Sequence, residues 1–206
     1  MTLLDALDYA SVFVFALTGA LAASRAQLDI VGFAFVASLT AVGGGTVRDV
    51  ILDRNPVFWV AEPAFIGVAV TAAVIVFFTA HRFESRLTVL TWLDALALSI
   101  AVPAGVGVAL AAGQPWGVTL LMGMVTGAFG GLMRDVVCNE VPLVLKQGEL
   151  YVTAAFAGAV AAVAALFVLP AGPALLLCAG VTFALRAGSL YFGWRLPVYR
   201  SRPPRR

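Results

Sequence analysis

The strongest constraint on the fold is a series of seven apolar stretches, each 18–23 residues long, that fill most of the 206-residue chain. About 20 residues of α-helix cross the roughly 30 Å hydrocarbon core of a bilayer. Charged residues make up only 12% of the chain, about half the share usual in soluble domains. The chain is therefore predicted to be an all-α integral membrane protein with seven transmembrane helices, at residues 6–23, 30–51, 63–80, 89–111, 117–138, 149–168 and 174–194.

The two halves of the sequence repeat each other. Arg48 and Asp49 recur 86 positions later as Arg134 and Asp135. Five further pairs keep this ungapped offset: Asp8 and Asp94, Gly19 and Gly105, Gly44 and Gly130, Gly45 and Gly131, Pro56 and Pro142. Since each copy holds three spans, the second copy is expected to be inverted relative to the first. We therefore expect one transmembrane domain over residues 1–194, with one repeat at about 6–80, a second at about 89–168 and a seventh helix at about 174–194.

Basic residues gather at one end of the predicted spans. They are Arg25, Arg82, Arg86, Lys146 and five arginines of the segment 195–206, namely Arg195, Arg200, Arg202, Arg205 and Arg206. The other end has mainly Arg54. Because cytoplasmic loops carry an excess of Lys and Arg, the N-terminus is expected outside, and residues 195–206 are expected to form a basic cytoplasmic tail.

The repeated motif places adjacent glycines inside an apolar run. Glycine destabilises a helix by about 1 kcal/mol relative to alanine. The second and fifth helices are therefore expected to be kinked and locally unwound, at Gly43, Gly44 and Gly45 and at Gly130 and Gly131. Carbonyl oxygens freed by unwinding are suitable ligands for a dehydrated monovalent cation, which is expected near Gly43, Gly44 and Gly130. The alternative is that the glycines only permit close helix packing.

The motif also places charges inside the membrane, where they are costly and commonly functional. Consecutive residues point about 100° apart on a helix, so Arg48 is not expected to pair with Asp49, and the same holds for the second copy. Asp49 and Asp135 are instead expected to face a wet cavity. Aspartates at matching depths of neighbouring helices are the candidate partners of the two arginines: Asp8 for Arg48 and Asp94 for Arg134. A structural alternative is that these pairs only fix helix positions.

Two further charged residues lie in the last two predicted spans. Glu149 stands at the start of the sixth, where a carboxylate stabilises a helix N-terminus. Arg186 lies within the seventh. It either extends toward the cytoplasmic face or pairs with an acidic residue, and the sequence leaves both readings open.

Several classes of function find no support. A formal net charge of +2 gives no indication of nucleic-acid binding. His81 is the only histidine, and Cys138 and Cys178 lack the spacing of metal ligands. No nucleophile lies near a base. The chain is therefore predicted not to be an enzyme and to need no cofactor, apart from K⁺ or Na⁺ bound in transit.

The segments GGGTVRDVILDRNPVFW and GGLMRDVVCNEVPLVL resemble the paired signature of the bacterial UPF0126 family. That family is related to the trimeric intracellular cation (TRIC) channels, and its members are also described as glycine transporter domain proteins. The resemblance covers about residues 5–192. It implies a homotrimer of seven-helix protomers with inverted repeats, in contact with lipid in the bacterial inner (plasma) membrane.

In the channel branch of this family, each protomer carries its own pore for monovalent cations, lined by the second and fifth helices. The second motif has Phe129 where a third glycine would stand, so this kink is expected to be stiffer. Carried over by motif, the residues of the cation pathway would be Gly43, Gly44, Gly45, Arg48, Asp49, Gly130, Gly131, Arg134 and Asp135.

These features favour a potassium-permeable channel in which the arginines gate the passage of cations. An arginine that moves across the membrane field gains about 2.3 kcal/mol per 100 mV, so gating by voltage is plausible. The alternative is a secondary carrier for a small neutral amino acid such as glycine, whose carboxylate could be held by a half-helix N-terminus or an arginine. A purely structural membrane protein would leave the duplicated charges unexplained.

Overall fold

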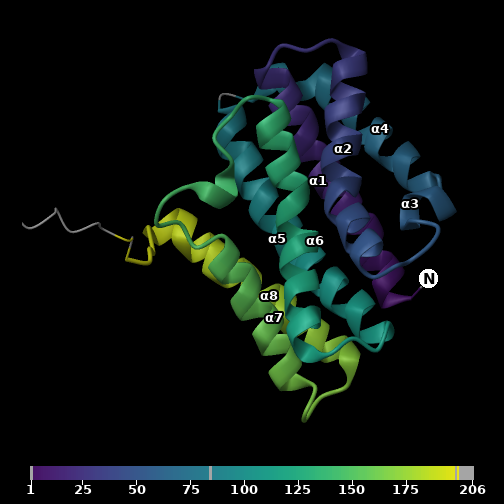
Figure 1. Cartoon of the computed structure of the whole chain (residues 1–206). Coiled ribbons are helices and arrows are strands. Elements are labelled where there is room, and N and C mark those ends of the chain that lie inside the picture. The colour runs from purple at the N-terminus through teal and green to yellow at the C-terminus, as the bar shows by residue number, and fades with distance from the viewer. Residues whose placement is uncertain (1, 84, 198, 200–206) are drawn as a thin grey trace, which may run out of the picture.

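The structure is a computed structural model that describes residues 2–83, 85–197 and 199. Most of the predicted tail, including four of its five arginines, lies outside the described residues. Within the described part of the chain, the regular elements are eight α-helices and two short 3₁₀ helices (Figure 1). They are α1 (Leu3–Arg25), α2 (Ile30–Ile51), α3 (Phe58–Ala61), α4 (Ala64–Thr79), η1 (Ala80–Arg82), α5 (Arg86–Ala111), α6 (Trp116–Val137), η2 (Leu143–Leu145), α7 (Val152–Ala165) and α8 (Ala171–Phe192).

Six of the described helices are long and apolar enough to cross a membrane, and they occupy six of the seven predicted spans. The exception is the predicted span 149–168, where α7 is only 14 residues long. At 1.5 Å per residue it extends about 21 Å, less than the roughly 30 Å hydrocarbon core. Seven full-length spans are therefore not confirmed, because η2 and a turn at Gly148 take up the chain before α7 begins.

Short polar signals set where several helices begin and end. Thr2 and Asp5 form a reciprocal capping box at the start of α1. The side chains of Asp29 and Ser85 accept backbone N–H groups in the first turns of α2 and α5. Gly193, with a φ of 70°, ends α8 in the left-handed conformation that glycine tolerates best. These four helix ends therefore follow from local sequence.

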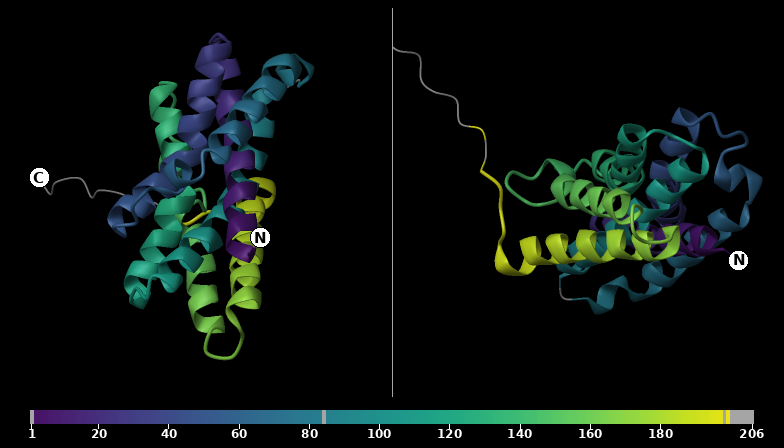
Figure 2. Two further views of the ribbon diagram at one scale, coloured as in Figure 1. Left: turned by 90° about the vertical axis from the view of Figure 1, so that its right-hand side faces the viewer. Right: turned by 90° about the horizontal axis from the view of Figure 1, so that it is seen from below.

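α5 is the central helix of the bundle. It packs against α1 on one side and against α6 and α8 on the other. The helices α1, α2 and α4 form one group, coloured purple to blue in Figure 1. The helices α7 and α8 form a hairpin, green to yellow in Figure 2. Because α2 and α6 also pack directly against each other, the two copies of the repeated motif face one another across the middle of the molecule.

α2 and α6 run without interruption through the repeated glycines. The prediction of local unwinding at Gly43, Gly44 and Gly45 and at Gly130 and Gly131 is therefore wrong. Neither α2 nor α6 is broken at these glycines. Unwinding would leave backbone carbonyls without partners in apolar surroundings, whereas an unbroken helix uses its carbonyl oxygens internally. The cation site predicted at freed carbonyls near Gly43, Gly44 and Gly130 loses its physical basis.

The glycines instead let α2 and α6 touch through their backbones. A Cβ atom on Gly44 would lie 2.2 Å from the carbonyl oxygen of Thr126, and one on Gly130 would lie 2.3 Å from that of Thr40. Real Cβ contacts essentially never fall below 3.0 Å, so even alanine would push the helices apart. The two contacts are reciprocal, because each threonine precedes the glycine of its own helix by four residues. This is the close packing through small residues that was the alternative reading of the motif.

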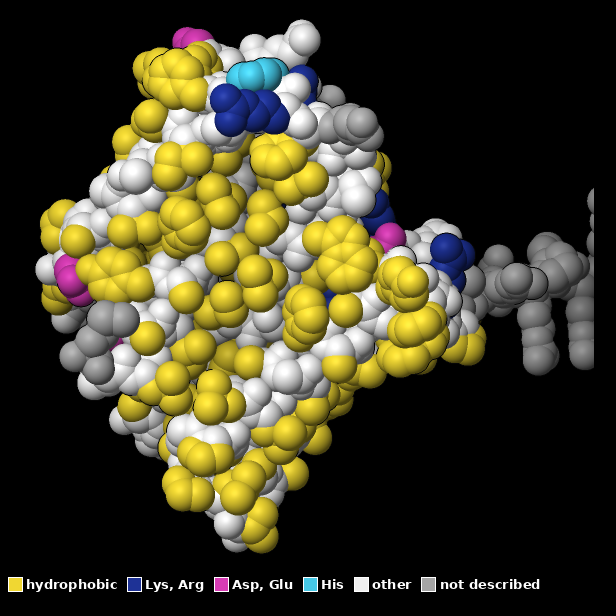
Figure 3. All heavy atoms as spheres, turned by 180° about the vertical axis from the view of Figure 1, so that it is seen from behind, with side chains coloured by type: hydrophobic (Ala, Val, Ile, Leu, Met, Phe, Trp, Pro, Cys, Tyr) yellow, Lys and Arg dark blue, Asp and Glu magenta, His cyan; other side chains and the backbone are white. Residues whose placement is uncertain are grey.

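The outer surface is apolar over a wide band. Hydrophobic side chains cover the middle and lower part of the face shown in Figure 3, whereas the His side chain and basic side chains lie at its upper edge and further basic side chains lie at its right-hand side. Large apolar residues are strongly exposed on several helices, among them Val31 at 71%, Val50 at 66% and Phe78 at 63%. A soluble protein rarely exposes so extensive an apolar surface, so the helices are those of a membrane protein.

Candidate functional site

The first charge cluster consists of Asp8, Arg48, Asp49 and Arg54. The guanidinium of Arg48 is fully buried, and it donates from Nη1 to Asp8 Oδ1 at 3.2 Å and from Nε to Asp49 Oδ1 at 2.8 Å. Arg54 Nη1 donates to the same oxygen of Asp49 at 3.0 Å. The second carboxylate oxygen of Asp49 accepts the backbone N–H of Phe58 at 2.9 Å. The cluster thus ties the end of α2 to α1 and to the start of α3.

The second charge cluster consists of Thr18, Asp94, Arg134 and Asp135. Arg134 is also fully buried, and its Nη1 donates to Asp94 Oδ1 and to Thr18 Oγ1, each at 2.9 Å. Its Nε donates to Asp135 Oδ1 at 2.7 Å. The other oxygen of Asp135 accepts the backbone N–H of Leu143 at 2.8 Å. This cluster repeats the plan of the first, with η2 in the place of α3.

Both predicted cross-helix pairs, Arg48 with Asp8 and Arg134 with Asp94, are present in the structure. The prediction that Arg48 does not pair with Asp49 is wrong, and the same correction applies to the second copy. The angle of about 100° describes where the side chains leave the helix, but an arginine is long enough to turn its Nε back toward the next residue. Sequence reasoning also missed Thr18 and Arg54.

Only one of the two aspartates lines a cavity. Asp49 is fully buried beneath two arginines, so the prediction of a wet cavity beside it is wrong. Asp135 lines a cavity of about 270 Å³ together with Arg25, Glu140 and Lys146. Glu140 lies 86 positions after Arg54, and it pairs with Arg25 at 2.9 Å rather than with Asp135. The second repeat thus has the acidic Glu140 where the first has the basic Arg54. Asp135 therefore pairs with one arginine, whereas Asp49 pairs with two.

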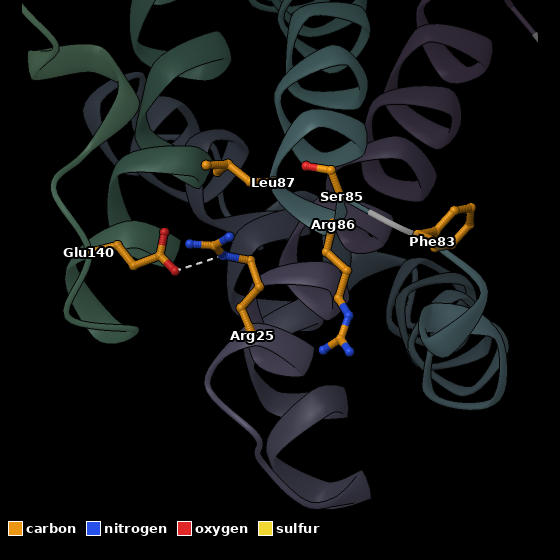
Figure 4. Close-up of a pocket in the computed structure, with 6 residues that line it drawn as sticks. All are labelled: Arg25, Phe83, Ser85, Arg86, Leu87 and Glu140. Atoms are coloured by element: carbon orange, nitrogen blue, oxygen red, sulfur yellow. Dashed lines mark hydrogen bonds and ion pairs between the residues drawn. The ribbon is translucent and has the colours of Figure 1, made fainter.

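Each cluster lies beneath a hollow at its own end of the molecule. Asp5, Asp8 and Arg54 line a cavity of about 370 Å³ beside the first cluster. At the opposite end, a hollow of about 490 Å³ adjoins the cavity of Asp135, since both include Arg25 and Glu140 (Figure 4). The cavities of the two ends share no lining residue. Between the two clusters lies the backbone contact of α2 with α6.

Three of the predicted glycines, Gly43, Gly44 and Gly130, lie along this contact. Gly43 faces Met133 and the Cα of Gly130 across the interface. Gly45 faces the ring of Phe58, and Gly131 faces the polar groups of the second cluster. Phe129 packs beside a separate small apolar cluster that includes Met122 and Val125. The structure therefore brings three of the five predicted glycines together at the helix crossing and places the charged residues at its two ends.

Within the described residues, no group of three or more His, Cys, Asp or Glu side chains has the arrangement of a metal site. Both cysteines are free, and Cys178 is buried in α8. Each of the four aspartates in the two clusters is paired with at least one arginine. Asp94 Oδ2 has no hydrogen-bond partner among the described residues.

Comparison with known proteins identifies relatives along most of the chain. The family model described as a glycine transporter matches residues 5–81 and 91–166. The UPF0126 inner membrane protein YadS of Escherichia coli (strain K12) is 34% identical over 197 residues, or 94% of each chain. The UPF0126 membrane protein YvgT of Bacillus subtilis is 27% identical over 94% of this chain and 95% of its own.

Solved structures include similar folds. The TRIC trimeric intracellular cation channel orthologue from Rhodobacter sphaeroides has a TM-score of 0.91 and 42% sequence identity, with coverage of 94% of this chain and 100% of that one. A prokaryotic TRIC channel studied in 0.5 M KCl has a TM-score of 0.87 and 26% identity, with coverage of 94% and 98%. Sequence and structure thus indicate the same group of membrane proteins.

Proposed function

This chain belongs to the TRIC cation-channel family and to its bacterial UPF0126 branch, and on that premise we propose that it is a potassium-permeable monovalent cation channel. Each protomer of a homotrimer carries its own pore between α2 and α6. The observation that supports this most strongly is the pair of buried charge clusters at the two ends of the same helix crossing. Both of the relatives with solved structures described above are TRIC channels, one of them studied in KCl.

The acidic groups at the two mouths suit a cation. Asp5 and Asp8 line one entrance and outnumber Arg54 there, whereas Asp135 and Glu140 line the other and balance the charges of Arg25 and Lys146. Carboxylates that line a cleft with low-dielectric walls raise the local cation concentration. Beyond each entrance a buried arginine holds its aspartates and repels a cation by its own charge. A cation therefore passes only when the arginine side chains move and the helices separate at Gly44 and Gly130.

The conformation described here corresponds to a closed state of this path. Backbone contact between α2 and α6 leaves no space at the crossing, and the cavities at the two ends do not meet. Opening requires the reciprocal glycine contacts to separate, which costs little side-chain rearrangement because glycine has no side chain. Arg48 and Arg134 would then carry charge through part of the membrane field, so the open probability would depend on voltage.

The orientation follows from the basic residues. Arg25, Arg86 and Lys146 line the cavities at the end of the second cluster. We place this end in the cytoplasm, with the N-terminus outside and the C-terminus inside the bacterial inner membrane. The units α1–α2–α4 and α5–α6–α7 are then inverted repeats within one domain, and α8 is added to the second unit. The reciprocal contacts of Gly44 and Gly130 support this symmetry.

A carrier for glycine is the second candidate, favoured by the family description. Arg48 Nη2 and Arg134 Nη2 have no hydrogen-bond partner among the described residues, and an arginine is a suitable donor to a small carboxylate. The two candidates differ in turnover. A carrier binds one substrate per cycle, whereas an open channel passes many ions and gives a measurable unitary current.

Purified protein in planar bilayers separates the two functions. With KCl on both sides, a channel gives step-like unitary currents, and under a KCl gradient the reversal potential lies near that of K⁺. The matched measurement is uptake of labelled glycine into proteoliposomes preloaded with glycine. Saturable counterflow without unitary current would reject the channel and support the carrier.

A further inference from the structure

Arg186 of α8 is a buried charge that the proposed pathway does not use. Its side chain is fully buried, and its Nη1 donates to Glu149 Oε2 at 2.8 Å. Its guanidinium lies 4.9 Å from the centroid of the Tyr151 ring. Of the two readings of the sequence, pairing with an acidic residue is therefore the one found. Arg186 Nε and Nη2 have no hydrogen-bond partner among the described residues, so the ring and Glu149 are the main groups that stabilise this charge.

Tyr151 in turn lies against the second charge cluster. Its side chain is only 2% exposed. Its hydroxyl lies 3.4 Å from the point where a Cβ atom of Gly131 would stand, and that point is 3.2 Å from Asp94 Oδ1 and 3.6 Å from Arg134 Nη2. The absence of a side chain at Gly131 thus leaves one small space around which the phenol, the carboxylate and the guanidinium converge.

Among the described residues, the first charge cluster has no such polar extension. The residue 86 positions before Tyr151 is Phe65, which lacks the hydroxyl. A Cβ atom on Gly45 would meet the ring of Phe58 at 2.6 Å, where its counterpart Gly131 meets polar atoms. The first repeat also has no helix that corresponds to α8. The two ends of the path are therefore built differently, and the difference lies where α8 is attached.

The segment that carries Tyr151 is held to α8 and to the chain beyond it. The backbone N–H of Leu150 donates to Ser189 Oγ of α8 at 3.0 Å. The N–H of Leu196 donates to the carbonyl oxygen of Gly148 at 3.2 Å. With the pair of Arg186 and Glu149, these contacts make the segment around Tyr151 move with α8.

We propose that Arg186 is a positioning residue for the second charge cluster. With Glu149 it holds Tyr151 against Asp94 and Arg134, and so sets how readily that ion pair opens. A guanidinium over an aromatic ring is most stabilising when both are removed from water, as they are here. Loss of the Arg186 charge frees the ring, and the cluster then opens more often toward the cavity of Asp135.

Two variants and one control test this role. Arg186→Gln removes the charge, and Tyr151→Phe removes only the hydroxyl that reaches the cluster. The control is Thr182→Val, one turn earlier on α8 and equally buried, which nearly keeps the volume and leaves Arg186 in place. The double variant of Arg186 and Tyr151 shows whether the two residues act through one another.

The first readout needs no ion current. Hydrogen exchange, followed by mass spectrometry on the protein in nanodiscs, reports opening at Leu143, whose N–H is bonded to Asp135. Arg186→Gln and Tyr151→Phe are each expected to speed exchange there by about tenfold, and the double variant by little more than either single one. Thr182→Val leaves the rate within about twofold. Equal rates in Arg186→Gln and Thr182→Val, or multiplied effects in the double variant, would overturn the proposal.

The second readout rests on the proposed channel function. In planar bilayers, both variants are expected to raise the open probability at a given voltage and to leave the unitary conductance unchanged. A changed conductance with an unchanged open probability would contradict a positioning role. If the wild type gives no unitary current, the channel function fails, while the exchange rates still decide the role of Arg186. If Arg186→Gln is not recovered folded, Tyr151→Phe and Glu149→Gln carry the same test.

Discussion

At the residue scale, the molecule stabilises two buried guanidiniums by giving each several acceptors. Arg134 bonds to two carboxylates and a hydroxyl, and Arg48 bonds to two carboxylates. A buried pair costs desolvation, so its presence alone does not stabilise the fold, but an unpaired buried charge is strongly destabilising. Changes to one partner are therefore expected to cost more than changes to both.

Arg134→Ala tests this directly. It leaves Asp94 buried without its partner, and the expected loss is about 3–5 kcal/mol of unfolding free energy. Adding Asp94→Asn should recover a large part of that loss, since the carboxylate charge is then gone. Thermal unfolding of the purified single and double variants measures both effects. Losses that simply add in the double-mutant cycle would rule out coupling between the two residues.

Arg54 is the basic residue that is exposed at the mouth of the first cluster, at 43% of its side chain. Its positive charge opposes the carboxylates of Asp5 and Asp8 in the same cavity. Arg54→Gln is expected to raise the unitary K⁺ conductance about twofold in 50 mM KCl, and to have little effect at 1 M, where the Debye length is about 3 Å. An increase that persists at 1 M would show that Arg54 acts by some means other than its charge.

At the element scale, the crossing of α2 and α6 is the contact on which the proposed path depends. The motif could be read either as two helix breaks or as two packing surfaces, and the structure contains the second. The reason is physical: a break inside apolar surroundings leaves carbonyls unpaired, whereas a glycine against a neighbouring backbone keeps its helix intact. The offset of 86 that relates the motifs also relates Thr40 to Thr126, and this was the signal in the sequence for a reciprocal contact.

Because the contact is reciprocal, Gly44→Ala and Gly130→Ala are expected to cost similar amounts. Overpacking of a close contact costs about 1–3 kcal/mol, and here the clash is with backbone, which cannot turn aside. Gly180→Ala on α8 is the matched control, because a Cβ atom there meets nothing within 4 Å in the chain. Thermal unfolding of the three variants checks this, and a control as unstable as Gly44→Ala would contradict the packing account.

At the scale of the whole molecule, the sequence predicts the apolar spans and the cross-helix ion pairs well, because both follow from local pattern and from the repeat. It does not predict that α7 is short, since residues 150–168 include no charged residue, and the turn at Gly148 and the packing of Tyr151 and Glu149 become apparent only in the structure. Nor does it predict the contact of Arg48 with Asp49, which depends on how a long side chain turns. The link from Arg186 to Tyr151 joins separate elements and has no counterpart in the first repeat.

In the proposed function, each protomer conducts cations along its own crossing of α2 and α6. Gly44→Leu should block that path, because its side chain lies beside the Thr126 carbonyl and would fill the gap that forms when α2 and α6 separate. Gly180→Leu is again the control. Size-exclusion chromatography establishes that every linked trimer assembles before it is placed in a bilayer.

The most direct measurement is the unitary current of linked trimers that contain none, one, two or three copies of Gly44→Leu. If each protomer has its own path, the wild-type trimer should show three equal conductance levels. Trimers with one, two or three copies of Gly44→Leu should then show two levels, one level and no current, respectively. The matching Gly180→Leu series should keep all three levels. Complete loss of current with a single blocked copy, or unchanged current with three, would contradict the account.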